Sequence, residues 1–303
     1  MDVVTADGEL LHCNSKQNQE LYWMARGSGP GFPGIVTKFY LEIRKAYSTM
    51  MQSFFAYPKS RCREILKWTA DISPGYDESV EIVAISQTLP GDDEHTIGVL
   101  FVTFQNSVEE AEAALAYGNK NRPDGFVVED INRLTSLEEQ YCVQGAANPE
   151  GHRYCADNAY ISNDDDVAAV LEPAFTTLPH RKAFSIYFSM NPCSRRQLPD
   201  MALSMQTDHY FATYTLWEHE VDDERCINWV RNVMKGIERH ADGSYLGDSD
   251  FQARCTRFWS DENARQLMTL RRRWDSEGRI CGFLDEGDRS GTKGLDNVHE
   301  WKL

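Results

Sequence analysis

The sequence predicts an α+β fold in which helices cover one face of an antiparallel sheet. Two stretches, residues 47–117 and 153–240, each read as strand, helix, strand, strand, helix, although no repeat is visible residue by residue. That order is typical of an antiparallel sheet with helices on one face. A hydrophobic fraction of 41% in 303 residues supplies a core for one large domain or two ordinary ones.

The first predicted elements are a hairpin and a short helix. Asp7-Gly8 is a strong signal for a two-residue turn, so residues 3–5 and 10–12 are expected to pair as strands. A helix is expected over residues 17–26, and it ends where glycine becomes frequent.

A stretch rich in glycine and proline, GSGPGFPG at residues 27–34, follows this helix. Its composition forbids a regular helix or a central strand. Glycine lets backbone approach a phosphate-bearing ligand closely, but a tight structural loop is the alternative. The stretch is neither G-x-G-x-x-G nor a Walker sequence, so it supports neither a nicotinamide-type Rossmann site nor a P-loop. A strand is expected next, over residues 35–43, because apolar and polar residues alternate there.

The first of the two stretches carries a helix with a clear start signal. Ser107 followed by Glu110 is a capping box, which satisfies amide groups that would otherwise lack partners. Together with its neighbours, the stretch predicts strands at 50–57, 79–88 and 96–104 and helices at 59–72 and 107–117.

The second stretch and the end of the chain carry the remaining elements. Three aspartates at 164–166 precede an apolar helix and are expected to cap it. Strands are predicted at 153–162, 183–190 and 209–218, helices at 165–177, 222–240 and 261–274, and a turn-like segment at 243–247.

Composition excludes several classes of protein. The net charge of −16 argues against a general nucleic-acid binder or a binder of anionic membranes. No run of about eighteen apolar residues predicts a transmembrane helix. The eight cysteines contain no C-x-x-C pair, and the strand at 217–220 would point its histidine away from its glutamates, so no metal site is expected. The first residues show no secretory signal, and the cellular compartment is left open.

Several segments carry a resemblance to a known family. The segments VVTADGELL (residues 3–11) and LYWMARGSGPGFPGIVT (residues 21–37) occur in family-like order and spacing. They resemble the second half of the FAD-binding domain of FAD-linked oxidases, the vanillyl-alcohol oxidase or PCMH superfamily. Within it, the similarity is to the berberine-bridge-enzyme-like or 6-hydroxynicotine-oxidase-like branch. The segments GSYLGDSD (residues 243–250) and RFWSDEN (residues 257–263) resemble later motifs of the same family.

The resemblance implies a particular domain organisation. Residues 1–47 would form part of a PCMH-type FAD-binding domain, residues 48–240 a substrate domain, and residues 241–303 a segment that returns to the FAD domain. The family's first FAD sub-part, which carries the pyrophosphate loop with its Gly-Gly-His, has no counterpart in this sequence. The chain thus resembles a shortened family member.

The resemblance also implies FAD as the cofactor and assigns residues to it. The glycine loop and the strand after it would contact the adenine and pyrophosphate, largely through backbone. A C-terminal asparagine and an aromatic residue would lie near the flavin ring, while Trp259 stands where the family commonly has tyrosine. The matching positions are Gly29, Gly31, Gly34, Ile35, Val36, Thr37, Tyr245 and Asn263.

The implied reaction is oxidation of a small alcohol, amine or related C–H donor, with dioxygen as the electron acceptor. The base would come from a substrate-domain strand; the candidates are Tyr154, Tyr160, Tyr187, His209 and Tyr210. Tyr187 and Tyr210 are favoured, because their strands best match the sheet that faces the flavin in the family. For each of them, a structural aromatic residue is the alternative. The alternative for the whole chain is a non-catalytic remnant, or a ligand- or partner-binding protein without FAD.

Overall fold

The computed structural model describes residues 1–191, 193–249, 254 and 256–280. The chain forms two compact units. The first comprises Met1–Arg44, Gln197–Met205 and Gly243–Leu303, and the second comprises Lys45–Arg196 and Gln206–Asp242. Helices and antiparallel strands are both present, so the predicted α+β class is confirmed. The assignment of flavin and substrate domains to stretches of the chain stays a prediction.

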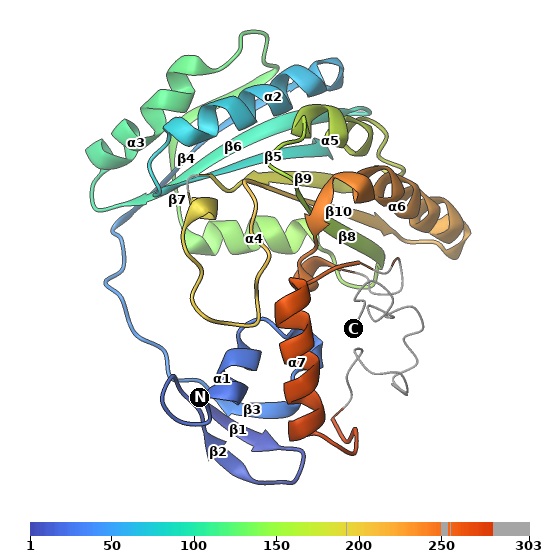
Figure 1. Ribbon diagram of the computed structural model, residues 1–303. Helices are drawn as coiled ribbons and strands as arrows, with labels where there is room; N and C mark the ends of the chain where they lie inside the picture. The colour runs from blue at the N-terminus through green and yellow to red at the C-terminus, as the bar shows by residue number, and fades with distance from the viewer. Residues whose placement is uncertain (192, 250–253, 255, 281–303) are drawn as a thin grey trace. The chain divides into compact units, whose positions relative to one another are not determined.

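The second unit is built on an eight-stranded sheet (Figure 1). Its spatial order is β11-β8-β10-β9-β5-β6-β4-β7. The strands are β4 (Thr49–Pro58), β5 (Val80–Thr88), β6 (His95–Gln105), β7 (Val128–Thr135), β8 (Arg153–Ile161), β9 (Phe184–Ser189), β10 (His209–Trp217) and β11 (Ala241–Gly243).

The repeated element order that the sequence predicts is confirmed, and the sheet joins the two copies. β4, α2, β5, β6 and α3 form one copy, and β8, α5, β9, β10 and α6 form the other. The copies meet at an antiparallel pair of strands, in which Ala84 of β5 lies opposite Tyr187 of β9. One continuous sheet therefore runs through both halves of the unit.

Four helices lie on one face of this sheet, which we call the helical face (Figure 1). They are α2 (Cys62–Ile72), α3 (Val108–Asn121), α5 (Val167–Thr176) and α6 (Asp223–Ile237). The expected caps form: the Ser107 hydroxyl accepts a hydrogen bond from the amide of Glu110, and Asp166 accepts one from the amide of Ala169. Each helix buries an apolar stripe against the sheet, as its periodicity requires.

The fifth helix of this unit, α4 (Leu137–Ala147), lies on the opposite face, which we call the α4 face (Figure 1). The amide of Gln140 donates a hydrogen bond to the side chain of Gln52 on β4. Neither α4 nor β7 was predicted from the sequence patterns. None of the residues of α4 is buried, so it has no apolar stripe that would reveal it. The pattern Ser136-x-x-Glu139 is the missed signal, because Ser136 caps this helix.

The first unit contains a small sheet and two helices. β1 (Asp2–Thr5) pairs with β2 (Leu10–His12) and with β3 (Gly34–Lys38), so the predicted hairpin is confirmed. The helices are α1 (Gln19–Ala25) and α7 (Asp261–Trp274). Their core is apolar and contains Val3, Cys13, Leu21, Trp23, Met24, Ala202, Phe258, Trp259, Ala264, Leu267, Met268 and Leu270. Asp250, the last residue of the GSYLGDSD segment, lies outside the described residues.

The predicted strand at 35–43 is shorter than expected, and this part of the prediction is wrong. β3 ends at Lys38, which lies opposite Asp2, the first residue of β1. A strand needs a partner for its backbone groups, and no described strand pairs with residues 39–43. Leu41 and Ile43 are consequently 83% and 94% exposed.

Candidate functional site

The glycine loop of the first unit packs tightly against its own unit. Gly27 and Gly29 have φ angles of +125° and +56°, which favour glycine. A Cβ atom on Gly27 would lie 2.2 Å from the backbone nitrogen of Leu203, and one on Gly29 would lie 2.7 Å from the side chain of Leu246. Internal packing therefore explains both glycines without a ligand.

The backbone of this loop is also held by side chains from the far end of the chain. Trp259 Nε1 donates a hydrogen bond of 2.7 Å to the carbonyl of Gly27. Arg271, which is 1% exposed, donates one of 2.6 Å from Nη1 to the carbonyl of Gly31. The amide of Gly31 in turn donates to the carbonyl of Ser28. Both backbone groups of Gly31 are thus engaged within the protein.

The strand after the loop has backbone groups that a ligand can reach. β3 lies at the edge of the described three-stranded sheet, and its only neighbour there is β1. Alternate peptide groups of Gly34, Ile35, Val36 and Thr37 therefore point away from β1. Ile35 is 58% exposed, whereas Val36 packs against the core.

Asn263 and Tyr245, the residues expected near a flavin ring, belong to the same unit. The side-chain amide of Asn263 donates hydrogen bonds to the carbonyls of Met201 and Ala202. Asn263 therefore fixes a neighbouring stretch of backbone, and its side-chain oxygen is the group left for a ligand. Tyr245 is 42% exposed. Its ring packs so closely on Gly247 that a Cβ atom at that position would clash with it.

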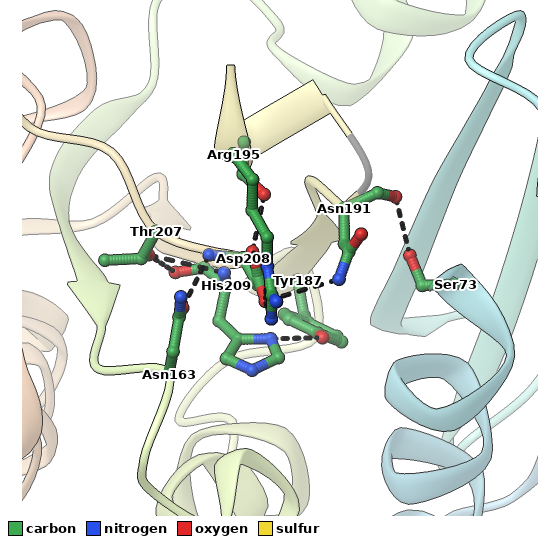
Figure 2. Close-up of polar contacts among 9 residues, drawn as sticks. Ser73, Asn163, Tyr187, Asn191, Arg195, Thr207, Asp208 and His209 are labelled. Carbon is green, nitrogen blue, oxygen red and sulfur yellow. Dashed lines mark hydrogen bonds and ion pairs between the residues drawn. The ribbon is translucent and has the colours of Figure 1, made fainter. Parts of the chain in front are cut away.

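Tyr187 lies in the second unit, on the helical face of the sheet. Its side chain is fully buried, and its hydroxyl lies 2.8 Å from His209 Nδ1 (Figure 2). Burial raises the pKa of Tyr187 and lowers the pKa of His209. Both side chains are consequently neutral at pH 7, and Tyr187 is unsuited to act as a base.

Tyr210 lies on the α4 face instead. It pairs with Tyr160 on β8 and Phe188 on β9, whereas Tyr187 pairs with Phe211, the neighbour of Tyr210. Successive residues of a strand point to opposite faces, so Tyr187 and Tyr210 cannot contact one substrate together. The sequence alone does not separate the two residues, because the face of each side chain depends on the strand register.

The α4 face carries a row of apolar side chains that crosses six strands. Directly paired residues on this face belong to one row, and we call this one the cross-sheet row. Its rings approach each other: the centroids of Tyr160 and Tyr210 are 5.2 Å apart, and those of Phe188 and Tyr210 are 6.1 Å apart. In order, the row is Tyr160, Tyr210, Phe188, Val83, Leu100 and Phe54.

A second polar cluster, around Asp208, was not anticipated from the sequence. Figure 2 shows the carboxylate of Asp208, which is 4% exposed, beside Arg195 and Asn191. Burial alone would raise the pKa of Asp208, but hydrogen bonds from Arg195 and Ser194, with the charge of Arg195, lower it overall. The amide of Asp208 donates to Asn163, so this cluster joins the start of β10 to the segments after β8 and β9.

The Asp208 cluster borders a polar cleft of about 380 Å³ beneath the ends of α2 and α5. Both cations of this cleft are paired: Lys67 binds Asp71, and Arg195 binds Asp208. In the described part of the chain, no group of three or more acidic, histidine or cysteine side chains could hold a metal ion. The paired charges are best explained as structural.

No helix in the described ranges is long and apolar enough to cross a membrane. No family model matches the sequence. Curated proteins do match it: the FAD-linked oxidoreductases nodO of Hypoxylon pulicicidum and ptmO of Penicillium ochrochloron are each 32% identical to this chain. The alignments cover 94% of this chain, 63% of nodO and 64% of ptmO. The chain thus spans just under two thirds of the length of these relatives.

Solved structures show the same fold at low sequence identity. The 6-hydroxy-D-nicotine oxidase of Arthrobacter nicotinovorans superposes with a TM-score of 0.71 at 16% identity. The berberine-bridge-enzyme-like protein 1 of Physcomitrella patens superposes with a TM-score of 0.70 at 14% identity. Each comparison covers 92% of this chain and 63% of the other.

Proposed function

Because the chain belongs to the superfamily of FAD-linked oxidases, we propose that it is an FAD-dependent oxidoreductase that oxidises a small organic molecule. The observation that carries this proposal is the 32% identity to curated FAD-linked oxidoreductases over 94% of the chain. The substrate class is an alcohol, an amine or a related C–H donor, and secondary metabolism is the proposed setting.

The first unit fits part of this cofactor. The outer edge of β3 offers peptide groups for the adenine or diphosphate, and the residues that would hold it there are Ile35, Val36 and Thr37. Gly29, Gly31 and Gly34 would support this edge, since their own surroundings are filled by protein. Asn263 and Tyr245 would lie near the flavin ring, as the family resemblance implies.

Bound FAD would supply the electron-acceptor chemistry: the substrate gives a hydride to flavin N5 and a proton to a base, and dioxygen takes two electrons and two protons to become hydrogen peroxide. The protein's task is to bind, orient and deprotonate the substrate. Tyr210 suits this task better than Tyr187, because Tyr187 is fully buried against the helical face and hydrogen-bonded to His209.

The second candidate function is binding without catalysis. It is favoured by the internal packing of Gly27 and Gly29, which needs no ligand. A protein of this kind would bind a ligand or partner through the second unit and would not retain flavin.

Flavin binding by the purified 303-residue chain separates the two functions. The protein is mixed with excess FAD, passed through gel filtration and examined for the visible absorption bands of bound flavin. The oxidoreductase proposal expects these bands to coelute with the protein and to bleach when dithionite is added. A colourless, folded protein that also fails to quench FAD fluorescence would overturn the oxidoreductase proposal in favour of the binding protein.

Peroxide release then tests the choice of electron acceptor. Flavin-loaded protein is reduced, exposed to air-saturated buffer and assayed for hydrogen peroxide with a coupled peroxidase. We expect about one equivalent of peroxide for each flavin that is reoxidised, because dioxygen accepts two electrons. Slow reoxidation without peroxide would contradict dioxygen as the acceptor and leave the FAD assignment standing.

A further inference from the structure

Two helices of the helical face, α5 and α6, lie side by side and leave a groove between them (Figure 1). The groove has a volume of about 640 Å³ and follows α6 from Trp229 to His240, about 16 Å at the helical rise per residue. Its walls are mainly apolar: Val170, Trp229 and Val233 are half-buried, and Pro173 is exposed. A third helix of about three turns fits this length and would cover these side chains.

The wall formed by α6 contains a glycine that faces open space. Gly236 lines the groove, and a Cβ atom at this position would have no described atom of another element within 4 Å. Glycine lowers the stability of a helix relative to alanine, so neither helix stability nor internal packing accounts for it. A glycine in this place allows the backbone of an incoming helix to approach α6 closely.

The border of the groove on the side of α6 is basic, although the chain as a whole is acidic. Between Arg225 and Ile237, α6 contains three cations and no acidic residue, whereas the chain has 47 acidic and 31 basic residues. Arg231 and Lys235 lie one helical turn apart and are exposed, and neither forms an ion pair within the described ranges. Arg239 lies one turn further and lines the groove itself. Exposed cations without partners attract anionic groups, so this border favours carboxylates.

Acidic side chains lie at one end of the groove and are already engaged. Asp165 lies 2.8 Å from His240, and Asp166 caps α5. Glu172, the acidic residue within α5, pairs with an arginine of α2 and does not line the groove. The wall formed by α5 therefore offers apolar contact, whereas the border formed by α6 offers positive charge.

We propose that this groove docks an amphipathic helix of a partner protein, with its apolar residues between α5 and α6 and a row of acidic residues beside Arg231 and Lys235. Charge complementarity is the reason for this occupant, because the basic border has no anions of its own. A second copy of the chain fits less well, since a two-fold interface would bring two identical basic borders together. The docking surface goes beyond the proposed oxidoreductase activity, because it lies on the helical face and needs no flavin.

A matched pair of peptides tests the charge requirement on the 303-residue chain. Both are capped, alanine-based helices of about fifteen residues with leucines at i, i+4 and i+7; one carries glutamates along one border, and the other carries glutamines there. Fluorescence anisotropy measures the dissociation constants, and we expect the acidic peptide to bind about tenfold more tightly. The net charge of −16 would by itself produce the opposite preference. Equal binding, tighter binding of the glutamine peptide, or binding of neither would overturn the proposal.

Two double variants show whether the basic border provides this preference. Arg231→Gln combined with Lys235→Gln removes two exposed cations from α6, so the acidic peptide should lose its tenfold advantage. Arg63→Gln combined with Lys67→Gln makes the same change in net charge on α2, also at exposed positions one turn apart, and should keep the advantage. A retained preference in the α6 double variant, with circular dichroism confirming the fold, would overturn the role of the border.

The groove is tested separately from the charge. Gly236→Gln places a side chain in the groove while favouring the helix, so it should weaken both peptides at least about tenfold without lowering the thermal unfolding temperature. Gly145→Gln in α4 is the matched control, since a Cβ atom there also meets nothing within 4 Å, and it should leave both affinities unchanged. Unchanged peptide binding in Gly236→Gln would overturn docking in the groove. Self-association of the chain in ultracentrifugation that Gly236→Gln abolishes would overturn the proposal in favour of a second copy.

Discussion

The hydroxyl of Tyr187 and Nδ1 of His209 lie 2.8 Å apart on adjacent strands of the sheet. Tyr187→Phe removes this hydrogen bond and leaves the ring in place. We expect a loss of about 1 kcal/mol in the free energy of unfolding, as for a typical buried hydrogen bond. Urea unfolding followed by circular dichroism measures this loss. Unchanged stability would contradict a structural role for the hydroxyl of Tyr187.

The burial of His209 makes the stability of the folded protein depend on pH. Burial lowers its pKa in the folded protein, so the unfolded chain binds a proton more readily. The stability difference is fully present above the unfolded pKa of about 6.5 and is lost as pH falls from there toward the lower folded pKa. His209→Gln should therefore reduce the decline in stability between pH 7 and pH 5. Urea midpoints across this range check it, and an equal slope in both proteins would contradict it.

Substitution of Asp208 is expected to lower the free energy of unfolding strongly, although no sequence motif marks this residue. Asp208→Asn retains the size of the side chain but leaves Arg195 without its anionic partner. The carboxylate of Asp208 is buried and accepts hydrogen bonds from Ser194, Arg195 and Asn191, whereas Arg195 itself is exposed, so the loss of the charge should destabilise the second unit by about 1–3 kcal/mol. The control is Arg63→Gln, which breaks the exposed pair with Glu172 and should cost about 1 kcal/mol or less. Equal losses in the two variants, measured by urea unfolding, would refute the importance of the cluster.

The sequence predicted the repeated strand-helix order and helix 261–274 because these depend on local periodicity and caps. It extended the strand at 35–43 too far, because a strand ends where its partner ends, and the partner β1 is distant in sequence. It treated Tyr187 and Tyr210 as equivalent, because the face of a side chain depends on register.

The close packing around Gly27 leaves no room for a side chain at this position of the glycine loop. Gly27→Ala would place a methyl group 2.2 Å from the backbone of Leu203 at a φ of +125°, so we expect a loss of about 3 kcal/mol or more, or failure to fold. Gly145→Ala in α4 is the control, because nothing lies within 4 Å of the new methyl group. Helix propensity should make that variant slightly more stable, by up to about 1 kcal/mol. Thermal unfolding of both proteins measures the contrast.

Arg271 links helix α7 to the glycine loop through a hydrogen bond to the carbonyl of Gly31. Its guanidinium donates to the carbonyls of Gly31 and Ile280, and Arg271→Met would leave both without this donor. We expect a loss of about 2–4 kcal/mol in stability and, under the proposed function, weaker FAD binding, because the loop supports β3. Arg273→Met is the matched control: its guanidinium is exposed and pairs with Glu20, so it should cost about 1 kcal/mol or less. FAD fluorescence titration below the unfolding temperature of each variant separates the two effects. A destabilised Arg271→Met protein that binds FAD as tightly as the unmodified chain would show that Arg271 holds the fold without shaping the cofactor edge.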